Sequence, residues 1–171
     1  MSNIIAERRT ASTDSPFVVF LIGMRINKPL KVHRWLPVSL AMGRMIKELE
    51  KTKNSDLLSY ESWFGRTTIM VQYWRSFEAL EQYAKNTDLE HRPAWAEFNR
   101  KINSNGDVGI WHETYTVNPG QFEVVYNNMP LFGLAKATSS IPATLGMANA
   151  ASRLKSANIK MENEAEAQAT N

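Results

Sequence analysis

The sequence contains no cysteine. This absence excludes disulfide bonds, thiolate nucleophiles, cysteine-ligated zinc and iron–sulfur clusters together. It fits a reducing compartment, and we expect a cytoplasmic protein. Histidine is also scarce, with three residues in the chain, and none of them stands in a His-x-His or His-x-x-x-His spacing. The sequence therefore predicts no local metal-binding motif.

Long hydrophobic runs and blocks of basic residues are missing as well. No apolar stretch reaches the roughly 18 residues of a membrane span, and the N-terminus lacks the apolar segment of a signal peptide. The net charge is only +3, with lysine and arginine scattered along the chain. We therefore expect neither a membrane nor a nucleic acid as partner. The 171 residues, 43% of them hydrophobic, are enough for one globular domain with a real core.

Composition divides the chain into three parts. Residues 1–15 are polar and without periodicity, which predicts a flexible N-terminal arm. Residues 16–147 carry the strand and helix patterns and form the body, including an ordered extension after Pro130. Residues 148–171 are rich in alanine, asparagine and glutamate and offer little apolar face, which predicts a frayed helix or a disordered tail.

The body alternates between strand-like and helix-like segments. A continuously apolar run, a Gly65-Arg66 hairpin and a final mixed run predict four strands, at 17–25, 57–64, 67–74 and 109–117. Periodicity near 3.6 predicts a helix over 33–53 that starts near Trp35, with Pro37 in its first turn. Ser76 as N-cap predicts a second helix to about Lys85, and Pro93 opens another helical segment to about Ile102.

This β-α-β-β-α-β order predicts an α+β fold of the ferredoxin-like type, with one antiparallel sheet and its helices on one face. The first strand is apolar throughout, and Ile69, Val71 and Tyr73 alternate with Met70 and Trp74 in the third. Both faces of the sheet are therefore apolar, and a monomer would expose a large hydrophobic patch. A homodimer that packs sheet against sheet removes this patch, so we expect a dimeric α+β barrel.

Three motifs resemble those of the dimeric α+β barrel superfamily. They are the run 71–80, the His-x-x-x-Trp from His91 to Trp95, and Gly-x-Trp-His-Glu-Thr-Tyr at 109–115. The superfamily includes antibiotic-biosynthesis-type monooxygenases, haem-degrading monooxygenases, chlorite dismutases and haem-dependent aldoxime dehydratases. The last motif, with 126–130 and Gly133-Leu134-Ala135, is most similar to a monooxygenase-like branch without an assigned substrate.

The resemblance implies a small-molecule monooxygenase-like or haem-dependent enzyme that binds an apolar substrate between sheet and helices. Such an enzyme would use either no cofactor or haem. The alternative is a non-catalytic dimeric module that binds haem or an apolar metabolite.

His112 is the strongest candidate for a catalytic residue, and His91 is the second; either would be the ligand if haem is bound. On a strand, His112 shares a face with Ile110 and Thr114, while Trp111, Glu113 and Tyr115 share the other. If Ile110 packs toward the helices, His112 faces the cavity in which the superfamily keeps its ligand; the opposite orientation exchanges the two sets. A buried histidine with a structural role is the competing interpretation. The residues expected to contact the substrate are Trp74, Trp95, Phe98, Trp111, Tyr126 and Asn127.

Overall fold

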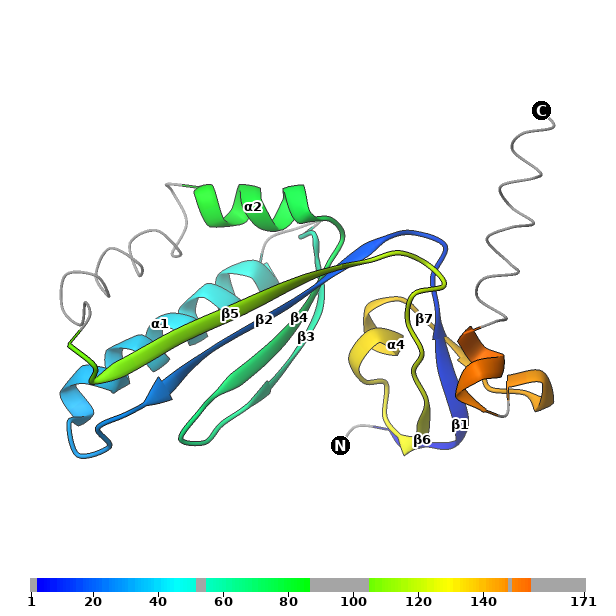
Figure 1. Cartoon of the computed structure of the whole chain (residues 1–171), viewed down its shortest axis with the longest axis horizontal. Coiled ribbons are helices and arrows are strands. Elements are labelled where there is room, and N and C mark those ends of the chain that lie inside the picture. The colour runs from blue at the N-terminus through cyan, green and yellow to red at the C-terminus, as the bar shows by residue number, and fades with distance from the viewer. Residues whose placement is uncertain (1–2, 52–54, 87–104, 148, 155–171) are drawn as a thin grey trace.

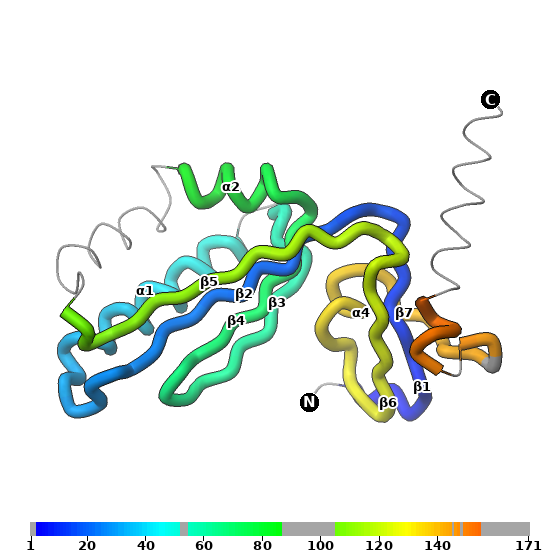
Figure 2. Tube along the Cα trace, in the orientation of Figure 1, coloured from blue at the N-terminus to red at the C-terminus, as the bar shows by residue number. Residues whose placement is uncertain are grey.

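The computed structural model describes residues 3–51, 55–86, 105–147 and 149–154, and these form two antiparallel sheets. The larger sheet has the strand order β3-β4-β2-β5, and the smaller has the order β6-β1-β7. The chain crosses between the sheets twice, from β1 into β2 and from β5 toward β6, as Figure 1 and the trace in Figure 2 show. None of the described helices is long and apolar enough to span a membrane.

The larger sheet carries the predicted ferredoxin-like pattern. Its elements are β2 (Phe17–Ile26), α1 (Val32–Lys51), β3 (Leu57–Trp63), β4 (Ile69–Trp74), α2 (Phe77–Lys85) and β5 (Val108–Val117). The four predicted strands and both of the predicted helices that lie within the described residues are confirmed. The further helical segment predicted over 93–102 lies outside the described residues.

Strand alternation puts the main core between this sheet and the helices. Val18 on β2 and Trp74 on β4 stand side by side in the ladder, and both are 2% exposed. They pack with Ile46 of α1 and Leu80 of α2. Both helices therefore cover the same face of the sheet, as Figure 1 shows, and they leave the opposite face uncovered.

Helix α1 begins earlier than the sequence predicts. Two hydrogen-bonded turns lead directly into this helix. The Lys31 amide donates to the Lys28 carbonyl, and the Arg34 amide donates to the Lys31 carbonyl. Pro37 is therefore the sixth residue of the helix and not part of its first turn. Because proline has no N–H, the bond that residue 37 would donate four residues back is missing. Pro37 and His33 are both exposed, so water can satisfy the carbonyl left without this partner.

The expectation of a flexible arm over residues 1–15 is wrong for its central part. Residues 5–12 form β1 (Ile5–Ser12), the middle strand of the smaller sheet. It pairs with β6 (Tyr126–Met129) on one side and β7 (Ser139–Pro142) on the other. The Thr10 hydroxyl also donates to the Val124 carbonyl at 2.8 Å. Partners from the C-terminal part thus satisfy the backbone of a segment that has little apolar pattern of its own.

The short helix α4 (Gly133–Ala137) and the smaller sheet cover one end of the open face of the larger sheet. Leu134 and Ala135 are buried against Phe17 and Tyr73, and Tyr126 closes the cluster. Gly133 has φ 55°, and a Cβ at this position would lie 3.1 Å from the Tyr126 hydroxyl. Glycine is thus needed for both the turn and the contact. A short 3-10 helix, η1 (Leu145–Met147), follows β7.

Candidate functional site

The register of β5 decides the orientation of His112. His112 stands opposite Ile22 of β2, and Ile110 stands opposite Met24. Met24 packs against Trp35 of α1, so this row of side chains faces the helices. His112 therefore lies on the helix-facing side, which is the first of the two orientations considered. Its ring centroid is 5.7 Å from that of Phe20, and its side chain is exposed near the free edge of the sheet.

Trp74 lies on the same face but is packed into the core. Its indole N–H donates to the Gln72 side-chain oxygen at 2.8 Å, and its ring lies 5.6 Å from that of Tyr83. Trp74 and His112 are thus on one side of the sheet, with β2 between their strands.

The remaining predicted residues are elsewhere. Trp111 lies on the open face, over Gly23. Tyr126 belongs to the cluster beneath α4, and Asn127 is exposed in the smaller sheet, where it pairs with Arg8. The structure does not bring these three to His112. His91, Trp95 and Phe98 lie outside the described residues.

A small cavity of about 40 Å³ lies between the sheet and the helices. By volume it holds about one water molecule. Its lining is almost wholly apolar, and consists of Phe20, Ile22, Met42, Met45, Ile46, Leu49, Gln72, Leu80, Tyr83 and Ala84. Phe20 joins this cavity to His112, because its ring contacts the imidazole. The one polar amide in the lining is Gln72, which the sequence reasoning did not single out.

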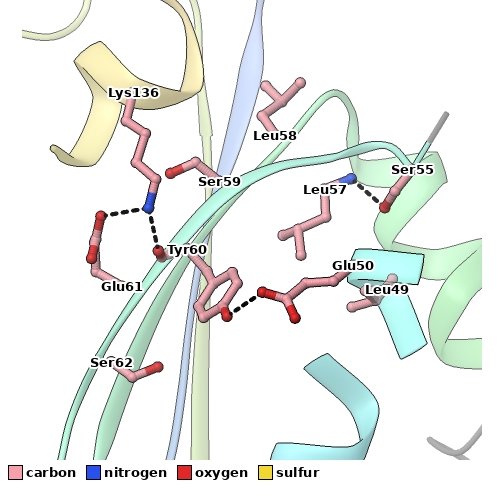
Figure 3. Close-up of a pocket in the computed structure, with 10 residues that line it drawn as sticks. All are labelled: Leu49, Glu50, Ser55, Leu57, Leu58, Ser59, Tyr60, Glu61, Ser62 and Lys136. Carbon is pink, nitrogen blue, oxygen red and sulfur yellow. Dashed lines mark hydrogen bonds and ion pairs between the residues drawn. The ribbon is translucent and has the colours of Figure 1, made fainter. Parts of the chain in front are cut away.

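A larger pocket of about 450 Å³ follows the edge of β3 (Figure 3). Residues 57–62 all line it, although neighbouring strand residues point to opposite faces, so the pocket runs along the hydrogen-bonding edge. Lys136 reaches over this edge to Glu61 at 3.1 Å and to the Tyr60 carbonyl at 3.4 Å (Figure 3). The Ser59 hydroxyl is buried there and has no hydrogen-bond partner among the described residues. None of the predicted site residues within the described part of the chain lines this pocket.

The tyrosines with raised pKa values stay protonated at neutral pH and therefore do not act as bases there. A hydrogen bond to Glu50 raises the pKa of Tyr60 to about 12. Burial, and then the neighbouring Tyr126, raise the pKa of Tyr73 to about 12. On the open face, Tyr115 donates to Glu113 at 2.6 Å, and this bond raises the pKa of the Tyr115 hydroxyl. All of these phenols stay protonated near pH 7.

No group of three or more histidine, aspartate and glutamate side chains that could hold a metal ion occurs among the described residues. The cavity beside Phe20 is also far below the roughly 300–1,000 Å³ of typical ligand pockets. The described residues around His112 therefore do not fit a haem group in this conformation.

Solved structures share the fold. An aldoxime dehydratase superposes with a TM-score of 0.61 at 14% identity, covering 84% of this chain and 45% of that one. An aldoxime dehydratase in complex with butyraldoxime gives 0.61 at 13% identity, covering 91% and 44%. At such identities the likeness shows a common α+β fold alone.

Sequence comparison defines the family. Residues 17–134 match the family model described as monooxygenase af470-like, and the chain belongs to this family. Monooxygenase af470 of Aspergillus fumigatus is 28% identical over 120 residues, which cover 65% of this chain and 42% of that protein. The chain thus matches about two fifths of the length of this curated relative. The resemblance inferred from the Gly-x-Trp-His-Glu-Thr-Tyr motif is confirmed for the family.

Proposed function

We propose that this protein is a monooxygenase-like oxidoreductase whose apolar substrate binds on the helix-facing side of the larger sheet. The observation that carries the proposal is the continuous row from the cavity through Phe20 to His112. His112 does not line the cavity itself, but an imidazole beside an apolar surface can exchange a proton with a hydrophobic molecule bound there. Membership of a monooxygenase-like family supports the same reading.

His112 is the proposed general base. An imidazole accepts protons near neutral pH, and exposure at the sheet edge lets it return the proton to solvent. The substrate gives a proton to the ring, and the electron pair left behind makes the substrate rich enough in electrons to react with O₂. One oxygen atom is inserted, the other leaves as water, and both reducing electrons come from the substrate. The chain then supplies a dry surface, orientation and a base. His91 is the second candidate for this role.

A homodimer is part of the proposal. Trp63 and Tyr115 on the open face are 45% and 50% exposed, and Leu21 and Val71 lie between them at half-buried positions. The smaller sheet and α4 cover the end of this face near Tyr73 and leave the rest to be covered. A second copy packed on this remainder would bury it.

The test uses His112→Ala with His33→Ala as its control, since both imidazoles are exposed and His33 lies on α1 away from the cavity. O₂ uptake is measured against a panel of hydroxylated aromatic compounds. Loss of a general base lowers the rate about 10²–10⁴-fold, and the control should keep the wild-type rate. Equal rates in wild type and His112→Ala would exclude this residue as the base.

An absorption spectrum with and without added haem tests the alternative, a module that binds haem or an apolar metabolite without turnover. A Soret band that His112→Ala abolishes would make His112 a haem ligand and contradict its role as a base. Light scattering at micromolar concentration checks the dimer, and a monomeric mass would contradict it.

A further inference from the structure

The two most exposed large apolar side chains among the described residues lie at one end of the larger sheet. Leu30 is 96% exposed in the connection from β2 to α1, and Phe64 is 83% exposed at the tip of the β3–β4 hairpin. The next in this order, Ile4, is 57% exposed. Single exposed apolar residues are common on protein surfaces, so the pair is informative only if the two tips lie together.

Hydrogen bonds hold the two loops side by side. The Ile26 amide donates to the Arg66 carbonyl at 2.8 Å, and the Arg66 guanidinium donates back to the Ile26 carbonyl at 3.3 Å. Leu30 follows shortly after Ile26 in the chain, and Phe64 shortly precedes Arg66. Figure 1 shows the hairpin and the connection at the same end of the larger sheet. The two apolar tips therefore belong to one surface.

The same end of the sheet carries an excess of positive charge. Three segments meet there, 25–34, 64–67 and 105–107, the last through bonds from the amides of residues 27 and 28 to the Asp107 carbonyl. Their cationic side chains are Arg25, Lys28, Lys31, Arg34 and Arg66. Their one carboxylate is that of Asp107, which is 6% exposed and pairs with Lys31. The three segments thus have a net charge of +4, whereas the whole chain has +3. Cations that are scattered along the sequence are brought together by the fold.

We propose that this end of the larger sheet docks onto the surface of an anionic membrane, with Leu30 and Phe64 inserted at the level of the lipid headgroups. Charge complementarity selects the partner, because an anionic bilayer attracts each lysine or arginine close to it. The apolar tips distinguish a bilayer from a soluble polyanion, which offers no apolar phase to receive them. A surface contact of this kind needs no membrane-spanning segment. The inference goes beyond the proposed oxygenase activity and does not depend on it.

The tips are held in place before any contact with lipid. The Lys31 amide donates to the Lys28 carbonyl at 3.0 Å and closes the turn that carries Leu30. Pro29 restricts the backbone of the same turn, since its ring fixes φ. Phe64 lies at the tip of a hairpin whose return strand is anchored in the sheet. A loop that is already ordered loses little conformational entropy when it binds, so a small surface can suffice for reversible docking.

The test is co-sedimentation of the full chain with vesicles of two compositions. One is phosphatidylcholine alone, and the other is phosphatidylcholine with about 30% phosphatidylserine. The wild type should bind the anionic vesicles at least about tenfold more tightly than the neutral ones. Because salt screens exposed charges, raising the salt concentration should reduce this difference.

Two sets of variants separate the charge from the apolar tips. Lys28→Gln removes one exposed cation and should weaken binding to the anionic vesicles about fivefold, and Lys28→Glu should weaken it about 25-fold. The double variant Leu30→Ser with Phe64→Ser keeps the charge and removes both apolar side chains. It should weaken the same binding about tenfold or more.

Each set has a matched control elsewhere on the surface. Lys47→Glu reverses an exposed cation on α1 that lies about 20 Å along the helix from residue 34. Leu131→Ser changes a side chain that is 53% exposed after β6, beside the smaller sheet. Both controls should bind the anionic vesicles within about twofold of the wild type, since neither residue belongs to the proposed surface.

The remaining outcomes name other occupants or none. A wild type that binds neither kind of vesicle, or both equally, would overturn the proposal, as would controls that lose as much binding as the variants. Binding that falls in Lys28→Glu and is unchanged in the double serine variant would point to a soluble polyanion in place of a bilayer. If light scattering shows a dimer that the double serine variant converts to a monomer, the two tips belong to a contact between copies of this chain, and the membrane proposal is refuted.

Discussion

Gly23 of β2 is the position at which one added methyl group should do most harm. A Cβ there would lie 2.0 Å from the Thr68 carbonyl oxygen and 2.8 Å from Nε1 of Trp111. Ordinary carbon–oxygen contacts begin more than 1 Å farther out, and the obstructing atom belongs to the backbone. The clash can therefore be relieved only by moving strands apart. Because Gly23 has no positive φ, the cost is steric and not conformational.

Gly23→Ala should lower the free energy of unfolding by about 3 kcal/mol, at the upper end of the usual cost of overpacking. For a protein of this length, each kcal/mol corresponds to about 2–4 °C in Tm, so the melting temperature should fall by about 6–12 °C. Thermal unfolding followed by far-ultraviolet circular dichroism measures this.

Gly43→Ala provides the matched control. Gly43 lies inside α1, and a Cβ there has no heavy atom within 4 Å. Alanine should stabilise the helix by about 0.5–1 kcal/mol, so the Tm should rise by a few degrees. If Gly23→Ala melts within 1 °C of the wild type, the close approach of Trp111 and the Thr68 carbonyl to Gly23 is wrong.

Three further predictions concern stability. The folded-state pKa of Tyr73 is raised from 10.0 to about 12, so the stability that protonated Tyr73 contributes is fully present below pH 10 and is lost as pH rises toward 12. Tyr73→Phe should therefore flatten the fall of the urea midpoint across that window. An unchanged slope would contradict this link between Tyr73 and stability. Ser76→Ala removes the oxygen that accepts the Ala79 amide at 3.1 Å and should cost about 1 kcal/mol in urea unfolding, whereas Ser76→Asp should retain most of it. Asp107→Ala should lower the free energy of unfolding by about 1–3 kcal/mol, because this buried carboxylate accepts from Lys31 at 2.9 Å. Asp56→Ala removes an exposed ion pair and should lower it by under about 1 kcal/mol. Equal losses would refute the distinction between the buried and the exposed carboxylate.

The sequence predicted those parts of the fold that depend on neighbouring residues. The 65–66 hairpin turn, the Ser76 cap and the alternation of β5 are local signals, and the structure confirms each of them. The orientation of His112 needed one more fact, the pairing of β5 with β2, which no local pattern specifies.

Two features were beyond local reasoning. Strand β1 has the polar sequence Ile-Ala-Glu-Arg-Arg-Thr-Ala-Ser, and it becomes a strand only through partners from 126–129 and 139–142. Gln72 was not among the residues predicted for the site. Its signal was the alternation itself, since it shares a face with the buried Met70 and Trp74. A glutamine between two apolar residues of one strand face is buried if they are.

The position of β1 also has a consequence for how the molecule is made. The hydrogen bond from Thr10 to Val124 joins residues 114 positions apart, so the middle strand of the smaller sheet is synthesised long before its neighbours. At typical ribosomal rates it waits roughly 6–20 s without a partner. During that time it is an unpaired strand that other chains can capture. Its charged residues Glu7, Arg8 and Arg9 oppose such pairing, and the same charges that hid the strand from prediction protect the nascent chain.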